Sequence, residues 1–334
     1  MKNKWLFYAL LLIVTYNCNS SKTKKLTIGL AMDTYTEERW KKDGQFFEER
    51  AAQLGATVIR QVCNGNEQLQ NEQVENLITQ GVDVLVIVPH NSKTAAKAVN
   101  SAKEAGIKVI AYDRMIKDCD LDLYVSFDNE QVGVLQAQTL VGLAPKGNYM
   151  LVEGSATDEN AFLYNKGHMQ ILKPLIDSGH ITIVMEQYCK DWLPIEAYKQ
   201  TQNALTKNNN NIAAILVAND GLAGGCIQAL TEQQLAGKIP VSGQDAELAA
   251  VQRVIDGVQS MTVYKPIKQL AYAGAEAAIA LAENKPTAAT TRTINNGKKE
   301  VSALLLAPVA VDKNNVKQTV IADGYIKATE LKMQ

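Results

Sequence analysis

Hydrophobic runs alternate with amphipathic stretches along most of the chain, and six of the runs end directly at polar side chains. Continuous apolar runs of this length are typical of parallel strands covered on both faces of a sheet. In an open α/β sheet, ligands bind outside the carboxyl ends of the strands. Repeated polar side chains at those ends therefore predict a site for a small polar molecule. The six runs, each with the polar residues that follow it, are 26–32 with Asp33, 82–88 with His90 and Asn91, 107–112 with Asp113 and Arg114, 123–127 with Asp128 and Asn129, 212–218 with Asn219 and Asp220, and 239–243 with Gln244 and Asp245.

The strand–helix rhythm predicts an α/β protein whose parallel sheets have right-handed crossovers. The rhythm restarts after Asp128, and 334 residues exceed the size at which one core usually keeps growing, so we expect two lobes, each a doubly wound parallel sheet. The expected strands are 26–32, 56–63, 82–88, 107–112, 148–153, 181–187, 212–218, 239–242 and 259–264, with a final extended segment at 301–311. The expected helices are 40–54, 68–80, 93–105, 131–143, 161–178, 196–207, 221–234, 247–257 and 267–283, and residues 284–299 are expected to form a surface loop or hairpin.

The N-terminus departs from this rhythm. A basic head at residues 1–4 precedes an apolar run at 5–14, which is too short to span a bilayer and fits a secretory signal. Cys18 follows directly and resembles the cysteine at which bacterial lipoproteins are cleaved and lipidated. We therefore expect a signal peptide at 1–18, a linker at 19–25 and a protein anchored by lipid at Cys18 in the periplasm or cell envelope. The alternative is an ordinary cleavage site with Cys18 nearby by chance.

Composition excludes several classes of function. The formal net charge is −1 and no basic block of five or more residues occurs, which argues against nucleic acid as a partner. No Walker-type loop, G-x-G-x-x-G or G-x-S-x-G motif is present, and the three histidines lie far apart in the sequence. We therefore expect no enzyme, cofactor or metal site. The four other cysteines are spread singly along the chain, and we expect them to be free and buried. They are Cys63, Cys119, Cys189 and Cys226.

The polar residues at the strand ends suit a sugar. Sugar hydroxyls both donate and accept hydrogen bonds, carboxylates accept from them, and Arg, Lys and Asn side chains donate to them. Aromatic rings cover the apolar C–H face of a pyranose. Beyond the signal segment the chain has two tryptophans, Trp40 and Trp192, and charged residues flank both. We expect them to stack on the ligand; the alternative is that they cover the hydrophobic core.

At these residues the sequence resembles the periplasmic D-xylose-binding proteins of ABC transporters, a branch of the type I periplasmic binding proteins. The similarity covers residues 26 to about 327. Its most specific motifs are Ala-Tyr-Asp-Arg-Met at 111–115 and Thr-Val-Tyr-Lys-Pro at 262–266. The others are Glu-Arg-Trp-Lys-Lys-Asp at 38–43, Gly-Val-Asp-Val-Leu-Val-Ile at 81–87, Val-Ser-Phe-Asp-Asn at 125–129, Asp-Trp-Leu-Pro at 191–194, Ala-Asn-Asp at 218–220 and Ser-Gly-Gln-Asp-Ala at 242–246.

The resemblance implies two α/β lobes joined by three crossovers, which close on D-xylose or a similar aldopyranose. We expect the first lobe at 26–128 and 264–303, and the second at 129–263 and 304–334. The implied partner is a membrane ABC permease, with a monomeric receptor as the family default. An alternative is a sensor subunit that presents the sugar to a membrane histidine kinase. Two other readings, a repressor core and a sugar-modifying enzyme with Asp113 or Asp245 as base, fit the sequence less well. The resemblance implies that Trp40 and Trp192 clamp the sugar and that hydrogen bonds come from Arg39, Asp113, Arg114, Asn160, Asn219, Asp245 and Lys265.

Simpler roles are open for several of these residues. Asp113 and Arg114 could form a plain ion pair, and Lys265 could serve only the hinge before a proline. Three others could merely cap the helices that follow them. They are Asn160, Asn219 and Asp245.

Three segments depart from the family pattern, and they leave the choice of sugar open. They are Thr-Tyr-Thr-Glu at 34–37, Glu-Gly-Ser at 153–155, and the side chains of Phe162 and Tyr164.

Overall fold

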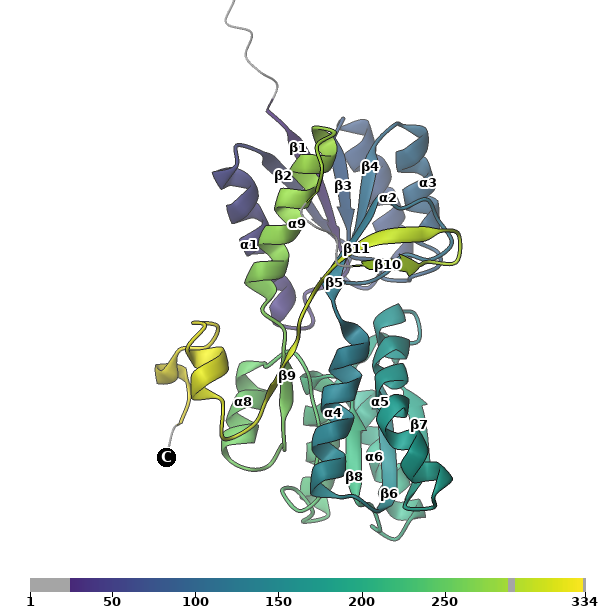
Figure 1. Cartoon of the computed structure of the whole chain (residues 1–334), viewed down its shortest axis with the longest axis vertical. Coiled ribbons are helices and arrows are strands. Elements are labelled where there is room, and N and C mark those ends of the chain that lie inside the picture. Colours follow the sequence, from purple (N-terminus) through teal and green to yellow (C-terminus); the bar gives the residue numbers. More distant parts are fainter. Residues whose placement is uncertain (1–24, 288–291, 333–334) are drawn as a thin grey trace, which may run out of the picture.

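The computed structural model describes residues 25–287 and 292–332 and shows two α/β lobes, one above the other (Figure 1). We call residues 25–127 and 267–306 the first lobe, and residues 129–264 and 309–332 the second lobe. The expected signal segment, Cys18 and most of the linker lie outside the described residues. Within the described part of the chain, no helix is long and apolar enough to cross a membrane.

The first lobe is built on a seven-stranded sheet with strand order β10-β11-β5-β4-β3-β1-β2. All neighbouring strands are parallel except β10 and β11, which form an antiparallel hairpin. The strands are β1 (Thr27–Met32), β2 (Thr57–Val62), β3 (Val84–Ile87), β4 (Lys108–Tyr112), β5 (Leu123–Phe127), β10 (Arg292–Asn295) and β11 (Glu300–Leu306). The segment 284–299, expected to be a surface loop or hairpin, contains β10 and the turn at 296–299 that joins it to β11.

Helices cover both faces of this sheet, which explains its continuous apolar strands. Val84 and Val86 pack with helices α1 (Arg39–Gln53) and α9 (Ile267–Ala282) on one face. Leu85 and Ile87 alternate to the other face, against α2 (Glu67–Thr79) and α3 (Ala96–Glu104). Figure 1 shows the two helix pairs on opposite sides of the sheet. The central strands β1, β3, β4 and β5 therefore bury both of their faces, whereas the edge strands β2 and β10 are partly exposed.

The second lobe contains a three-stranded parallel sheet, β7-β6-β8, flanked by two pairs of helices. Its strands are β6 (Gly147–Glu153), β7 (Ile181–Tyr188) and β8 (Ala214–Val217), and its helices are α4 (Asn129–Leu143), α5 (Glu159–Asp177), α6 (Pro194–Lys207), α7 (Asp220–Glu232) and α8 (Leu248–Ile255). Gly133 and Gly167 let α4 and α5 approach closely, because a Cβ at either position would lie about 2 Å from the other helix's backbone. A short antiparallel pair, β9 (Thr262–Tyr264) with β12 (Val309–Val311), completes the lobe.

The strand expected at 239–242 does not form; a single bridge joins Ile215 to Val241 instead. Pro240 explains the difference, because it has no N–H to donate to a ladder. Its carbonyl still accepts from Ile215 at 2.9 Å, so the segment lies beside the sheet without lengthening it. The helix expected from residue 93 begins later, at Ala96. The four expected free cysteines are all free and buried.

Candidate functional site

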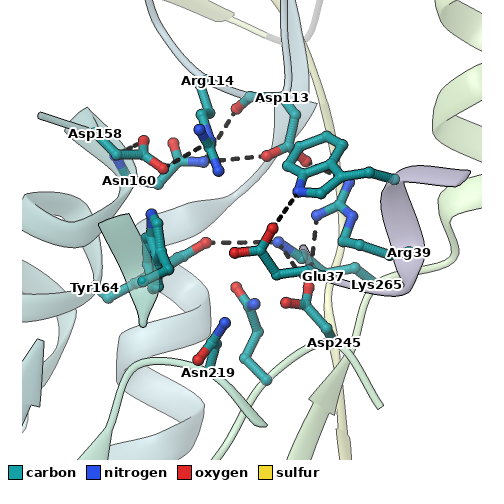
Figure 2. Close-up of a pocket in the computed structure, with 13 residues that line it drawn as sticks. Glu37, Arg39, Asp113, Arg114, Asp158, Asn160, Tyr164, Asn219, Asp245 and Lys265 are labelled. Atoms are coloured by element: carbon teal, nitrogen blue, oxygen red, sulfur yellow. Dashed lines mark hydrogen bonds and ion pairs between the residues drawn. The ribbon is translucent and has the colours of Figure 1, made fainter. Parts of the chain in front are cut away.

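A cavity of about 270 Å³ lies between the two lobes, where the carboxyl ends of the strands of both sheets meet. All nine side chains expected from the sequence line it: Arg39, Trp40, Asp113, Arg114, Asn160, Trp192, Asn219, Asp245 and Lys265. Four further residues complete the wall, namely Glu37, Asp158, Tyr164 and Gln244. Figure 2 shows the labelled polar side chains converging on this space from the elements of both lobes.

Arg39 forms the centre of a buried ion-pair network at one end of the cavity. It lies in the first turn of α1, and three carboxylates surround its guanidinium group. Asp43 accepts from Nε at 3.0 Å, Asp113 from Nη2 at 2.7 Å, and Asp245 from Nη1 at 3.5 Å. Burial disfavours the cation, but these carboxylates outweigh that effect and hold the pKa of Arg39 well above its ordinary value. Arg39 therefore joins the first lobe to Asp245 of the second.

Arg114 makes a second connection between the lobes. Its Nη1 lies 2.6 Å from Asp33 at the end of β1, and its Nε lies 2.8 Å from Asp158 at the start of α5. Asp33 is also bonded to His90 at 2.9 Å. Burial alone would raise the pKa of Asp33, but His90 and Arg114 lower it to about 2. The two lobes therefore meet through buried, oppositely charged groups, and the cleft in this structure is closed.

Asp113 is held in a left-handed backbone conformation with φ of 60° directly after β4. Its carbonyl oxygen accepts from the hydroxyl of Ser126 at 2.6 Å, and its carboxylate accepts from Asn160 Nδ2 at 3.2 Å. Asp113 and Arg114 thus pair with other residues and do not form the simple ion pair that the sequence left open. Asn160 does not cap α5; Asp158 does, by accepting from the Asn160 amide at 3.0 Å.

Lys265 and Asn219 face the cavity from the second lobe and the crossover. Lys265 is 1% exposed, and its Nζ lies 3.2 Å from Asp245 and 3.5 Å from the Tyr164 hydroxyl. Its role therefore extends beyond the hinge. Asn219 caps α7 through Oδ1, which accepts from the Leu222 amide at 2.9 Å. The cap uses the oxygen of Asn219, and its amide nitrogen remains for the cavity. Glu247, not Asp245, occupies the cap position of α8.

Both tryptophans border the cavity, in different surroundings. The Nε1 of Trp40 donates to Glu37 at 2.8 Å, and the guanidinium of Arg39 lies 4.3 Å from the centre of its ring. Trp192 packs on Gly154 and meets Tyr164 edge-on, with ring centres 6.3 Å apart. An indole fits there only because residue 154 has no side chain.

Two polar atoms of the wall are buried without a hydrogen-bond partner among the described residues. They are Nε1 of Trp192, a donor, and Oε1 of Gln244, an acceptor. A buried polar group left without a partner costs about 1–3 kcal/mol, and such groups in native proteins usually have a specific reason. A ligand hydroxyl can accept from one and donate to the other. The cavity is therefore equipped for a neutral polyhydroxy molecule.

Sequence reasoning missed four of the lining residues, although it had signals for three. Glu37 and Tyr164 lie in the segments that depart from the family pattern, and Gln244 directly follows one of the six apolar runs. No role was predicted for Asp158 from the sequence. The described residues contain no group of His, Cys, Asp and Glu placed to hold a metal ion.

Comparison with known proteins agrees with this geometry. The family model described as "Periplasmic binding protein domain" matches residues 28–286. The chain is 51% identical over 312 residues to the D-xylose-binding periplasmic protein of Escherichia coli K12, covering 93% of this chain and 94% of that protein.

The chain belongs to the periplasmic binding proteins.

Two other proteins resemble the chain over nearly its whole length. A multiple sugar-binding periplasmic receptor from Rhizobium radiobacter is 38% identical, over 92% of this chain and 93% of its own length. The carbohydrate transporter solute-binding protein of Chloroflexus aurantiacus, crystallised with D-glucose, is 34% identical and superposes with a TM-score of 0.87 over 93% of this chain and 99% of its own. As a periplasmic binding protein, the chain is a solute-binding receptor with the expected two-lobed α/β fold, and not an enzyme.

Proposed function

We propose that this receptor binds D-xylose, or a similar aldopyranose, in the cavity between its lobes and delivers it to an ABC permease. The observation that carries the proposal is the pair of partnerless buried groups, Trp192 Nε1 and Gln244 Oε1, inside a ring of charged hydrogen-bonding side chains. The 51% identity to the D-xylose-binding protein of Escherichia coli supports the choice of sugar.

The nine residues expected from the sequence are proposed to contact the sugar. Trp40 and Trp192 would cover its C–H faces, because both are buried at the cavity wall. The charged and amide groups would bond its hydroxyls at roughly 1.5–3 kcal/mol for each bond to a charged group. A few such bonds are enough for micromolar affinity, about 8 kcal/mol, after the costs of desolvation and association.

Lobe closure would couple binding to transport. Besides the pairs of Arg39 and Arg114, a backbone bond from Ser92 to Thr157 (2.8 Å) and a pair between Lys117 and Glu159 (2.8 Å) join the two lobes. A sugar that bonds both lobes binds the closed state better than the open one and shifts the population toward closure. The permease would then recognise the closed surface.

Isothermal titration with xylose, ribose, arabinose and glucose tests the proposal. We expect D-xylose to bind with micromolar or tighter affinity and ribose to bind more weakly. No heat from any of the four sugars at millimolar concentration would remove the sugar-receptor function.

Anchoring at Cys18 in the cell envelope is a separate proposal, supported by the signal-like segment that precedes it. The mass of the mature protein extracted from cells tests it. Lipidation predicts a diacylglyceryl-modified chain beginning at Cys18, and Cys18→Ala should abolish that mass. An unmodified mature chain would contradict the proposal.

A further inference from the structure

The carboxyl groups that line the cavity outnumber its cations by one. Three cations, Arg39, Arg114 and Lys265, face four acids. Each of the three aspartates among those acids has a cation within 3.2 Å: Asp113 has Arg39, Asp158 has Arg114, and Asp245 has Lys265.

Glu37 is the fourth acid, and it forms no ion pair within the described part of the chain. Trp40 Nε1 donates to its Oε2 at 2.8 Å, and the backbone N–H of Glu37 also interacts with its carboxylate. Glu37 is nonetheless buried, with only 8% of its surface exposed. Burial raises the pKa of its carboxyl group, and the charge of Arg114 acts in the opposite direction. An acid buried in this way without a cation has polar capacity that the protein itself does not use.

The position of Glu37 shows which part of a ligand it would meet. In Figure 2 its carboxyl group lies in the middle of the ring of lining side chains. Glu37 also lines a second, outer cavity of about 610 Å³, which contains Asp33 and His90. Glu37, Arg114 and Trp192 are the residues common to both linings and so form the boundary between them. A group attached to the outward edge of a bound pyranose would pass Glu37 and find space beyond it.

We propose that Glu37 is a specificity-determining residue that binds the hydroxymethyl hydroxyl of an aldohexopyranose, so that the site accepts hexoses as well as pentoses. This inference rests on the proposed sugar-binding function. Residue 37 lies in one of the segments where the chain departs from the D-xylose-binding pattern, and a pentopyranose has no hydroxymethyl group for it to bind. The hexose hydroxyl would donate to the Glu37 oxygen that Trp40 leaves free.

A double-mutant cycle between protein and ligand tests the proposal. Affinities for D-glucose and 6-deoxy-D-glucose are measured by isothermal titration on the full-length receptor, first unaltered and then with Glu37→Leu. The unaltered receptor should bind D-glucose about tenfold to hundredfold more tightly than the deoxy sugar, which corresponds to one hydrogen bond to a charged group. With Glu37→Leu this ratio should fall to about one, whatever the change in the absolute affinity for either sugar.

The ratio separates hydroxyl recognition from a merely structural role. If Glu37 only holds Trp40 in place, Glu37→Leu weakens both glucose sugars equally, the ratio is unchanged, and the proposal is wrong. The neighbouring acid provides the matched control: Glu38 is half exposed and pairs with Lys42 at 2.9 Å, so Glu38→Leu should leave the ratio unaltered. Glu37→Ala is the second variant, in case the leucine destabilises the fold.

The unaltered receptor also gives a decisive result. Binding of D-xylose without detectable binding of D-glucose at millimolar concentration would overturn the role of Glu37 and leave the proposed receptor function intact. Failure to bind either sugar would remove both.

Discussion

Gly154 is the position where a single methyl group tests the binding site most directly. It follows β6, and a Cβ added there would lie 2.0, 2.3 and 2.4 Å from three ring carbons of Trp192. Contacts that short require an atom to move. The Gly154 backbone is fixed by the bond from the Cys189 amide to its carbonyl at 3.1 Å, and Tyr164 contacts the indole on another side. The ring must therefore shift, and the open space beside it is the cavity.

We expect Gly154→Ala to weaken D-xylose binding about tenfold to hundredfold. Overpacking of this kind costs about 1–3 kcal/mol, and a displaced indole would also reduce the space that the cavity offers to the sugar. Because 1.4 kcal/mol corresponds to a factor of ten in affinity, the upper part of this range gives the predicted loss. Isothermal titration measures the affinity, and a thermal melt shows whether the fold survives.

Gly142→Ala is the control for this substitution. Gly142 lies in α4, and an added Cβ there would have nothing within 4 Å. It should leave affinity unchanged and raise stability by about 0.5–1 kcal/mol, since alanine favours a helix over glycine. If Gly154→Ala binds D-xylose within twofold of the unaltered protein, Trp192 does not contact the sugar as we propose.

Three further predictions follow from the buried charges. Arg39→Lys should weaken sugar binding at least hundredfold in a titration, because a lysine cannot bridge Asp113 and its other acids; an unchanged affinity would contradict the network's role. Asp158→Asn removes one partner of the buried ion pair that joins the lobes in the closed state and leaves Arg114 without it, so sugar affinity should fall at least tenfold in a titration; an unchanged affinity would argue against a role of this ion pair in closure. Burial raises the pKa of Asp220 to about 7, so between about pH 4 and pH 7 the unfolded state has lost a proton that the folded state keeps, and the stability contributed by this group falls by about 1.4 kcal/mol per pH unit as pH rises. In urea unfolding measured between about pH 4 and pH 7, the free energy of unfolding of Asp220→Asn should fall less steeply with pH than that of the unaltered protein. Equal slopes would show that Asp220 does not have a raised pKa.

Residues at strand ends were predictable because the sheet itself places them. An apolar run that ends at Asp113 or Asn219 brings the next side chain to the carboxyl edge, whatever the details of packing. The same reasoning identified Gln244 as a strand-end residue but did not show that it faces the cavity. The next residue, Asp245, adopts a left-handed φ of 100° that the sequence did not predict.

Cavity residues on helices and loops were harder to predict, because whether their side chains reach the cavity depends on how the two lobes meet. Asp158 caps α5, the role that the sequence left open for Asn160, and its pairing with Arg114 exists only when the second lobe closes on the first. Glu37 and Tyr164 appeared in the sequence only as departures from the family pattern. In the structure both departures lie in the wall of the cavity, so the differences bear on the ligand itself.

The energetics of the closed cleft explain why closure needs a ligand. The buried pair of Arg114 and Asp158 adds little net stability, because desolvation of two charges offsets their attraction. Closure also buries Trp192 Nε1 and Gln244 Oε1 without partners among the described residues, at about 1–3 kcal/mol each. Shifting a receptor from 1% to 99% closed requires a ligand preference of about 5.5 kcal/mol for the closed state. A sugar that satisfies these two atoms would supply about 2–6 kcal/mol, a large part of that preference, and its bonds to the charged side chains of both lobes would supply the rest.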